Sequence, residues 1–277
     1  MKNFGYLLIV NNDKDNLYHR MAHVLASSIK KTQPKNYDNV CLITDRKDLS
    51  DSGYVFDKII FNDDYVGWDQ RNYMDKLTPY KHTICLDVDM VFTRDISHWV
   101  DYFVSDPNGL YITKNVLKYN GDKLTNLKCR PGYVENNISI LYSGFTYFSK
   151  ESKIVPKFFK LVHAITENKT TFKNLYMSKN SPKEIGTDEA FSIASHILDI
   201  DYLELSFPRF VHLKSELQDY GLQSISRDLG YYLDSSANIT IGNYAQYDII
   251  HYSEKDFPIS NIQQVYKELF LKGIKHV

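Results

Sequence analysis

Two aspartates separated by one residue, Asp87 and Asp89, are the residues whose types and spacing best suit chemistry. They end the apolar run that begins at His82, and this run predicts a buried strand. Side chains two positions apart in an extended chain lie on one side, and open α/β sheets bind ligands at the carboxyl ends of their strands. Two such carboxylates repel each other unless a cation lies between them. The pair therefore predicts a site for a hard divalent cation, Mg²⁺ or Mn²⁺, which also recruits phosphate oxygens.

The segments that must position this pair alternate between two patterns. Continuous apolar runs predict strands at 6–10, 40–44, 58–61 and 82–87, and helical spacing predicts helices at 17–29 and around 72–77. This alternation predicts an α/β fold with a mainly parallel sheet flanked by helices. The second half is more mixed, with strands expected at 139–148, 207–213 and 248–252 and helices at 152–166, 188–198 and 261–272.

Length and composition set the class of protein. The chain has 277 residues, 43% of them hydrophobic, with 12 Gly, 8 Pro and a formal charge of -1. These values exclude a disordered, collagen-like or coiled-coil protein. Without a repeat or an evident linker, we expect one domain over 1–277.

The ends and the cysteines indicate a cellular location. The first apolar run, Tyr6 to Val10, is too short for a signal peptide or a membrane span, so we expect a cytoplasmic protein with no membrane segment. Cys41, Cys85 and Cys129 are odd in number and far apart, so no disulfide framework or zinc site is expected, and the first two are predicted to be buried free thiols.

The aspartate pair, following three strand and helix units, resembles the DxD motif of nucleotide-sugar glycosyltransferases with the GT-A (Rossmann-like) fold. Within these it is most similar to the glycogenin-like enzymes of glycosyltransferase family 8. Asn11 and Asn12, with Tyr18, resemble the loop after the first strand that holds the nucleoside in that family.

Three later segments fall in the family's order. Lys76 precedes the DxD strand as the family's donor-binding lysine does, and Ser143-Gly144 resembles its Asn-Ser-Gly segment with Tyr142 in place of the Asn. The segment 186–189, Gly-Thr-Asp-Glu, resembles the one whose side chains hold the donor sugar. The segment 249–258 resembles the late strand that supplies a metal-binding His and a diphosphate-binding Lys, although it lacks the family's Gly and Trp and has a shorter His-to-Lys spacing.

The resemblance implies a set of site residues. The metal ligands would be Asp87, Asp89 and His251, and the acidic catalytic residues Asp188 and Glu189. The donor-binding residues would be Asn11, Asn12, Tyr18, Lys76, Asp87, Val88, Ser143, Gly144 and Lys255. Within the single domain, about 1–110 would form the nucleotide-binding half, about 111–258 the acceptor and metal half, and 259–277 a C-terminal helix.

The implied reaction agrees with the residue types. Departure of a diphosphate develops negative charge, which a cation and lysines stabilise. One imidazole among oxygen ligands favours Mn²⁺ over Mg²⁺. No general base is evident, which fits the family's commonly described retaining course, in which the leaving phosphate accepts the acceptor's proton. The favoured donor is a UDP-sugar.

The acceptor is indicated less directly. The segment from Lys114 to Lys183 holds thirteen basic and four acidic residues, a net charge of +9, interleaved with aromatic residues. A solvated helix face and an anionic partner both explain it. With a composition resembling that of tailed-bacteriophage proteins, one acceptor is the hydroxymethylated bases of phage DNA, modified in the host cytoplasm. A glycan or protein acceptor is the other, and His212 and Lys214 offer polar groups for either.

Each assignment has a structural alternative. Asp188 and Glu189 suit the N-terminus of a helix, and Gly144 suits a bulge or close packing. His251 suits a hydrogen-bonded core position, and Tyr18 suits helix packing. At the level of the whole chain, the alternative is a nucleotide-sugar or carbohydrate-binding protein that keeps the GT-A fold without turnover.

Overall fold

The structure is a computed structural model. It describes residues 4–47, 55–64, 67–114, 116–117, 136–139, 141–177, 185–200, 210–212, 231–233, 239–241, 244–246 and 249–251. The predicted C-terminal helix at 261–272 lies outside these residues, as do Cys129, Lys214 and Lys255.

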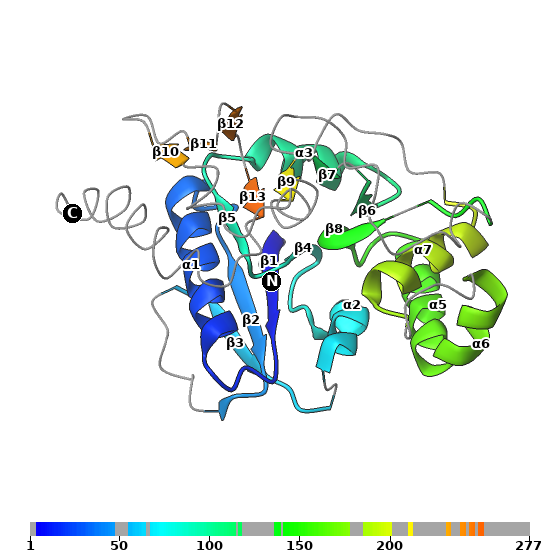
Figure 1. The fold of residues 1–277 in the computed structure, drawn as a ribbon. Helices are drawn as coiled ribbons and strands as arrows, with labels where there is room; N and C mark the ends of the chain where they lie inside the picture. The colour runs from blue at the N-terminus through cyan, green and yellow to red at the C-terminus, as the bar shows by residue number, and fades with distance from the viewer. Residues whose placement is uncertain are drawn as a thin grey trace.

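A six-stranded sheet organises the described residues, in the order β3-β2-β1-β4-β8-β6 (Figure 1). Its strands are β1 (Phe4–Val10), β2 (Val40–Thr44), β3 (Lys58–Phe61), β4 (His82–Leu86), β6 (Leu110–Thr113) and β8 (Tyr142–Ser149). The first four pair in parallel, and β8 is antiparallel to both β4 and β6. The predicted mainly parallel sheet is therefore confirmed, with its strand order reversing between β1 and β4.

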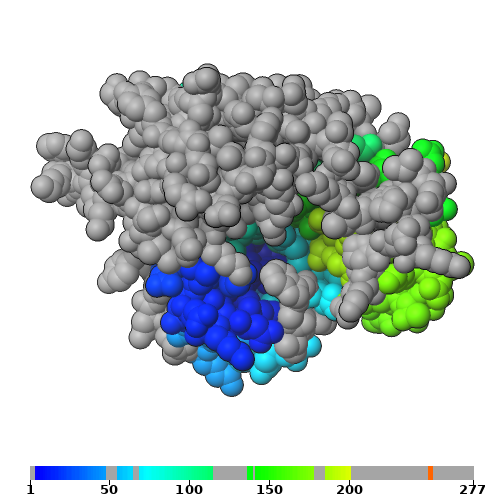
Figure 2. All heavy atoms as spheres, viewed as in Figure 1, coloured from blue at the N-terminus to red at the C-terminus, as the bar shows by residue number. Residues whose placement is uncertain are grey.

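The continuous apolar runs form strands because both faces of the sheet are covered. On one face, α1 (Leu17–Thr32) and α3 (Ser97–Ser105) pack against alternate residues of β1 such as Tyr6 and Leu8. On the other face, α5 (Val155–Glu167) and α7 (Thr187–Ile197) cover Leu7 and its neighbours. In Figure 2 the N-terminal residues (blue) and those of α5 and α6 (green) accordingly lie on opposite sides of the view.

Shorter elements complete the described residues. They are the 3₁₀ helix η2 (Gly67–Tyr73), α2 (Met74–Leu77), α6 (Lys169–Tyr176) and an antiparallel sheet of β10 (Tyr231–Leu233), β11 (Ile239–Ile241) and β12 (Tyr244–Gln246). Cys41 and Cys85 are buried free thiols, as predicted. Among the described residues, no helix combines the length and apolar character needed to cross a bilayer.

A second sheet brings a late strand to the end of β4. Its order is β5 (Met90–Phe92), β13 (Ile249–His251), β9 (Phe210–His212) and β7 (Val116–Leu117). Strand β13 runs antiparallel to β5, with His251 opposite Met90, and parallel to β9. Since Met90 directly follows Asp89, this pairing places His251 beside the aspartates.

The loop after β1 is held by a buried carboxylate. Asp13 accepts hydrogen bonds from the backbone N–H groups of Leu17 (2.9 Å) and His19 (2.7 Å), which closes the N-terminus of α1. The His19 ring joins Asp13 (Nδ1, 2.7 Å) to Thr44 at the end of β2 (Nε2, 2.9 Å). Asn12 and Asn16 have φ of 52° and 58°, a left-handed conformation that asparagine tolerates well. The loop beyond β1 thereby takes a fixed path along the carboxyl edge of the sheet.

Replacing Asp13 by Asn should lower the free energy of unfolding by about 1–3 kcal/mol at neutral pH, because an amide offers one acceptor where the carboxylate offers two. Burial opposes ionisation of Asp13, but the hydrogen bonds from the backbone and ring of His19 outweigh it and lower the pKa below its ordinary 3.8. The stabilisation is therefore complete above the unfolded-state pKa and is lost as pH falls through the folded-state pKa.

Urea unfolding of the wild type and the Asn variant at neutral pH and at pH near 3.5 checks this. The matched control is Asp15→Asn, in the same loop but exposed. A difference between wild type and Asp13→Asn that does not shrink in acid would contradict the assignment.

Candidate functional site

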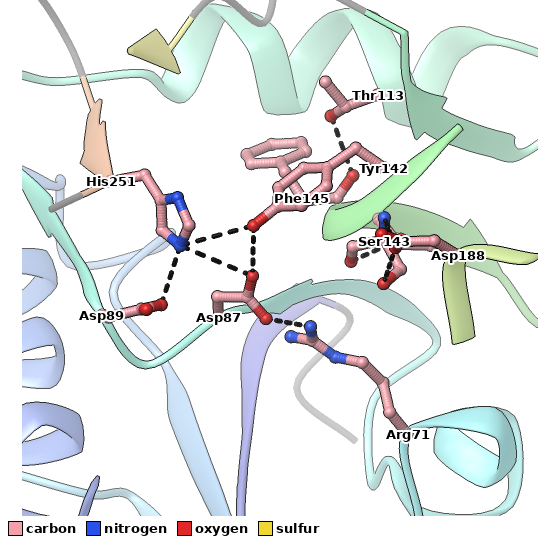
Figure 3. A network of polar contacts seen from close by, with 10 residues as sticks. Arg71, Asp87, Asp89, Thr113, Tyr142, Ser143, Phe145, Asp188 and His251 are labelled. Atoms are coloured by element: carbon pink, nitrogen blue, oxygen red, sulfur yellow. Dashed lines mark hydrogen bonds and ion pairs between the residues drawn. The ribbon is translucent and has the colours of Figure 1, made fainter. Parts of the chain in front are cut away.

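Asp87, Asp89 and His251 converge at the carboxyl edge of the central sheet (Figure 3). Each offers a ligand atom, and these atoms all lie within 4.8 Å of one another. His251 Nε2 is 2.8 Å from Asp89 Oδ1 and 3.6 Å from Asp87 Oδ2, and the imidazole is buried. Residues far apart in sequence thus form one cluster of a kind that can hold a divalent cation.

The aspartates converge by a route that differs from the prediction. An extended strand through residue 87 was expected to align both carboxylates, but β4 ends at Leu86 and residues 88–89 form a turn into β5. The Asp87 N–H donates to the Gly144 carbonyl of β8 (2.8 Å), which fixes the start of this turn. The chain leaves one sheet for the other here, so the turn, and not strand alternation, sets the direction of the two side chains.

The charges in the cluster depend on one another. Burial alone would lower the pKa of His251, but the carboxylates of Asp89 and Asp87 outweigh burial and raise this pKa. Burial alone would raise the pKa of Asp89, but His251 outweighs it and lowers that pKa. The pair therefore favours an ionised carboxylate beside a cationic partner.

Arg71 is a member of the site that the sequence analysis missed. Its guanidinium, presented by η2, forms an ion pair with Asp87 Oδ1. Lys76, which was assigned from the same segment, lies in α2 with Nζ 5.1 Å from the centre of the Tyr73 ring. The sequence signal for Arg71 is weak, because it is one of several basic residues before β4 and its direction depends on the 3₁₀ helix.

Tyr142 is a second residue outside the predicted set. Its hydroxyl donates to Asp87 Oδ2 at 2.7 Å and lies 3.4 Å from His251 Nε2. Burial raises the pKa of this phenol well above its ordinary value, and the nearby carboxylates raise it further. A phenol that keeps its proton serves here as a hydrogen-bond donor.

Ser143, predicted as a donor-binding residue, and Asp188, predicted as a catalytic residue, are joined by hydrogen bonds. The Ser143 N–H and Oγ both donate to Asp188 Oδ1, at 2.8 and 2.6 Å. Glu189 is buried, and its Oε2 accepts from the Gly186 N–H at 3.0 Å, so this carboxylate closes the first turn of α7. Glu189 therefore has the role at a helix N-terminus that was considered as its structural alternative. Its assignment as a catalytic residue stays a prediction.

The remaining predicted residues lie around this edge or beyond the described chain. Asn11 and Asn12 follow β1, and the Asn12 N–H donates to Asp45 Oδ2 (2.9 Å) at the neighbouring strand end. Tyr18, in the first turn of α1, packs against the core, and Val88 is buried in the turn between β4 and β5. The backbone of His212 aligns with that of His251 across β9 and β13. Lys214 and Lys255 lie outside the described residues.

No protein-family model matches the chain, and no curated protein sequence does. Solved structures do match its fold. Mouse xyloside xylosyltransferase 1 superposes with a TM-score of 0.55 and 12% identity, over 91% of this chain and 98% of that one. The galactosyltransferase LgtC, solved with donor and acceptor sugar analogs, gives 0.51 and 8%, over 95% and 94%.

The bifunctional glycosyltransferase WbbM gives a TM-score of 0.50 and 11% identity, over 96% of this chain but 51% of its own. This chain therefore spans about half of WbbM and nearly all of the other two. At such identities the likeness concerns the fold, and it confirms the predicted GT-A fold.

Replacing Gly144 by Ala should lower the free energy of unfolding by about 1–3 kcal/mol through overpacking. A Cβ there would lie 2.3 Å from Tyr142 Cε1 and 2.6 Å from Asp87 Oδ2, so the ring and the carboxylate must both shift away from it. The control is Gly186→Ala, whose Cβ would meet the end of the flexible Glu189 side chain at 2.9 Å. Urea unfolding measures both, and an equal or smaller cost at Gly144 would contradict the packing described.

Proposed function

We propose that the protein is a metal-dependent glycosyltransferase that transfers a sugar from a nucleoside diphosphate sugar, with a UDP-sugar as the leading donor, to an acceptor hydroxyl. The observation that carries the proposal is the convergence of Asp87, Asp89 and His251 at the reversal of strand order in a GT-A sheet. That edge is where open α/β sheets bind nucleotides.

The cluster fits a divalent cation by its donor set. Two carboxylates and one imidazole offer oxygen and nitrogen atoms close enough to share one ion. The single nitrogen favours Mn²⁺, and Mg²⁺ is the alternative. When bound, the cation supplies positive charge that offsets the charge developing on the leaving diphosphate.

The protein's own groups would bind and orient the donor. The Arg71 guanidinium, held beside Asp87, offers a planar set of donors suited to phosphate oxygens. Lys76 and Lys255 are proposed as further point charges for the diphosphate. Asn11, Asn12 and Tyr18, at the end of β1 and the start of α1, are proposed to hold the nucleoside.

The donor sugar is proposed to lie between β8 and α7. Asp188, whose Oδ1 accepts two hydrogen bonds from Ser143, is proposed to bind sugar hydroxyls, and Glu189 follows it in the first turn of α7. The proposed course retains the anomeric configuration, with the leaving phosphate accepting the acceptor's proton. The transferred group is proposed to be a hexosyl or pentosyl group.

Replacing Asp89 by Ala should reduce donor turnover at least about 100-fold, the scale seen when one group that stabilises developing charge is removed. The assay is hydrolysis and transfer across a panel of nucleotide sugars with Mn²⁺, with folding checked by circular dichroism. The control is Asp63→Ala, which changes an exposed aspartate two residues after the end of β3. This variant should turn over the donor normally.

Near-normal turnover by Asp89→Ala, with unchanged Mn²⁺ dependence, would remove the metal assignment. Donor binding by the wild type without any turnover would favour a binding protein with a GT-A fold. If the wild type neither binds nor hydrolyses any nucleotide sugar of the panel, the enzyme proposal is wrong.

The acceptor is proposed to be a carbohydrate hydroxyl or a hydroxymethylated base in DNA. In the described part of the basic segment, Lys153, Lys157 and Lys160 are exposed around α5 while its apolar side is buried. Lys169 is paired with Asp69 at 2.6 Å, which offsets part of the +9 charge. The ion pair lowers the positive charge available to a polyanion, which favours the carbohydrate acceptor.

Salt dependence should distinguish the two acceptors. For DNA, log K should fall by about 0.9 per phosphate contact for each unit of log salt, whereas a sugar acceptor gives a nearly flat response. Acceptor binding and turnover are measured on hydroxymethylated duplex DNA, unmodified duplex DNA and a set of glycans at several salt concentrations. We expect turnover on a glycan, and selective, salt-dependent turnover on hydroxymethylated DNA would reverse this preference.

A further inference from the structure

The Tyr142 hydroxyl lies among the proposed metal ligands although it has no part in the donor set assigned above. It is 2.7 Å from Asp87 Oδ2 and 3.4 Å from His251 Nε2, and its ring centre is 5.8 Å from that of His251 (Figure 3). These separations are similar to those between the proposed ligand atoms themselves. The phenol is therefore part of the cluster in space.

The local backbone is suited to this placement. Tyr142 begins β8, and its ring folds back over residue 144 toward the end of β4. Only glycine at 144 leaves room, because a Cβ would lie 2.3 Å from the ring and 2.6 Å from the Asp87 carboxylate. The Gly144 carbonyl in turn accepts from the Asp87 N–H, so backbone and side chain both join these two strand ends.

Asp87 is consequently held from both sides. Arg71 pairs with Oδ1, and Tyr142 donates to Oδ2. A carboxylate with both oxygens engaged by separate side chains cannot rotate without breaking one of these interactions. Groups that orient a metal-binding carboxylate in this way typically change metal affinity 10- to 100-fold when they are removed.

We propose that Tyr142 is a positioning residue of the cation site, whose hydroxyl holds the Asp87 carboxylate in the orientation that converges with Asp89 and His251. This rests on the cation site of the proposed function. The phenol acts through Asp87 and is not itself a ligand. Its loss should weaken cation binding while leaving the ligands in place.

The test compares Tyr142→Phe with Tyr147→Phe. Both tyrosines lie on β8 and both hydroxyls are hydrogen-bonded, but the contact of Tyr147 is with His82 Nδ1 (2.9 Å), outside the cluster. The probe is Mn²⁺ alone, titrated against each variant and followed by the electron paramagnetic resonance signal of the free ion. Tyr142→Phe should bind Mn²⁺ at least about tenfold more weakly than wild type, and Tyr147→Phe within about twofold of it.

The outcomes separate the two proposals. If the wild type and Tyr147→Phe do not bind Mn²⁺, the cation site itself is wrong. If the wild type binds and Tyr142→Phe binds equally well, the positioning role is wrong and the cation site stands. Tighter binding by Tyr142→Phe would also overturn the role, because the hydroxyl would then compete with the ion. If circular dichroism shows that Tyr142→Phe is unfolded, Tyr142→Met, which fills irregular space without a donor, replaces it under the same criteria.

Discussion

The repulsion between two carboxylates held close together at a buried strand end is the constraint on which the rest of the site depends. Asp87 and Asp89 are separated by one residue and face the same cluster, so each needs a compensating group. The chain supplies three from separate elements: His251 from β13, Arg71 from η2 and Tyr142 from β8. The two sheets must meet at this point because no single element carries all of these groups.

The strand pairing of the second sheet therefore determines the position of a cluster residue. His251 is 162 positions from Asp89, and it reaches that carboxylate because β13 pairs antiparallel with β5, in register with Met90. A one-residue slip of this pairing would turn the imidazole to the other face of the sheet. The apolar residues of β5 and β13, Val91 and Ile250 among them, are buried in the main core, which fixes the register. Packing energy thus sets the geometry of a polar site.

Much of this architecture could be predicted from local patterns. The strands at 40–44 and 58–61 match β2 and β3, since their apolar runs are continuous and their ends are polar. The cluster of Asp87, Asp89 and His251 was predicted because the spacing of the aspartates indicates a cation site and the segment 249–258 resembles the family strand that supplies a metal-binding His. Arg71 and Tyr142 were not assigned to the cluster, because a 3₁₀ helix and a missing Cβ at Gly144 direct their side chains. The turn at 88–89 was missed for a related reason: strand alternation and a turn between two sheets bring the same two carboxylates together.

The carboxylates at the ends of the neighbouring strands β1 and β4 accept hydrogen bonds from different kinds of donor. Asp13, after β1, is satisfied by backbone N–H groups of α1 and by His19, donors that the helix holds in place. Asp87, after β4, is satisfied by the tips of the Arg71 and Tyr142 side chains. Backbone donors cannot leave without unwinding a helix, whereas side-chain donors can move within a rotamer. The carboxylate at β4 is therefore oriented by side chains that can adjust around a ligand, whereas the one at β1 is fixed by the backbone of α1 and holds that edge of the sheet in place.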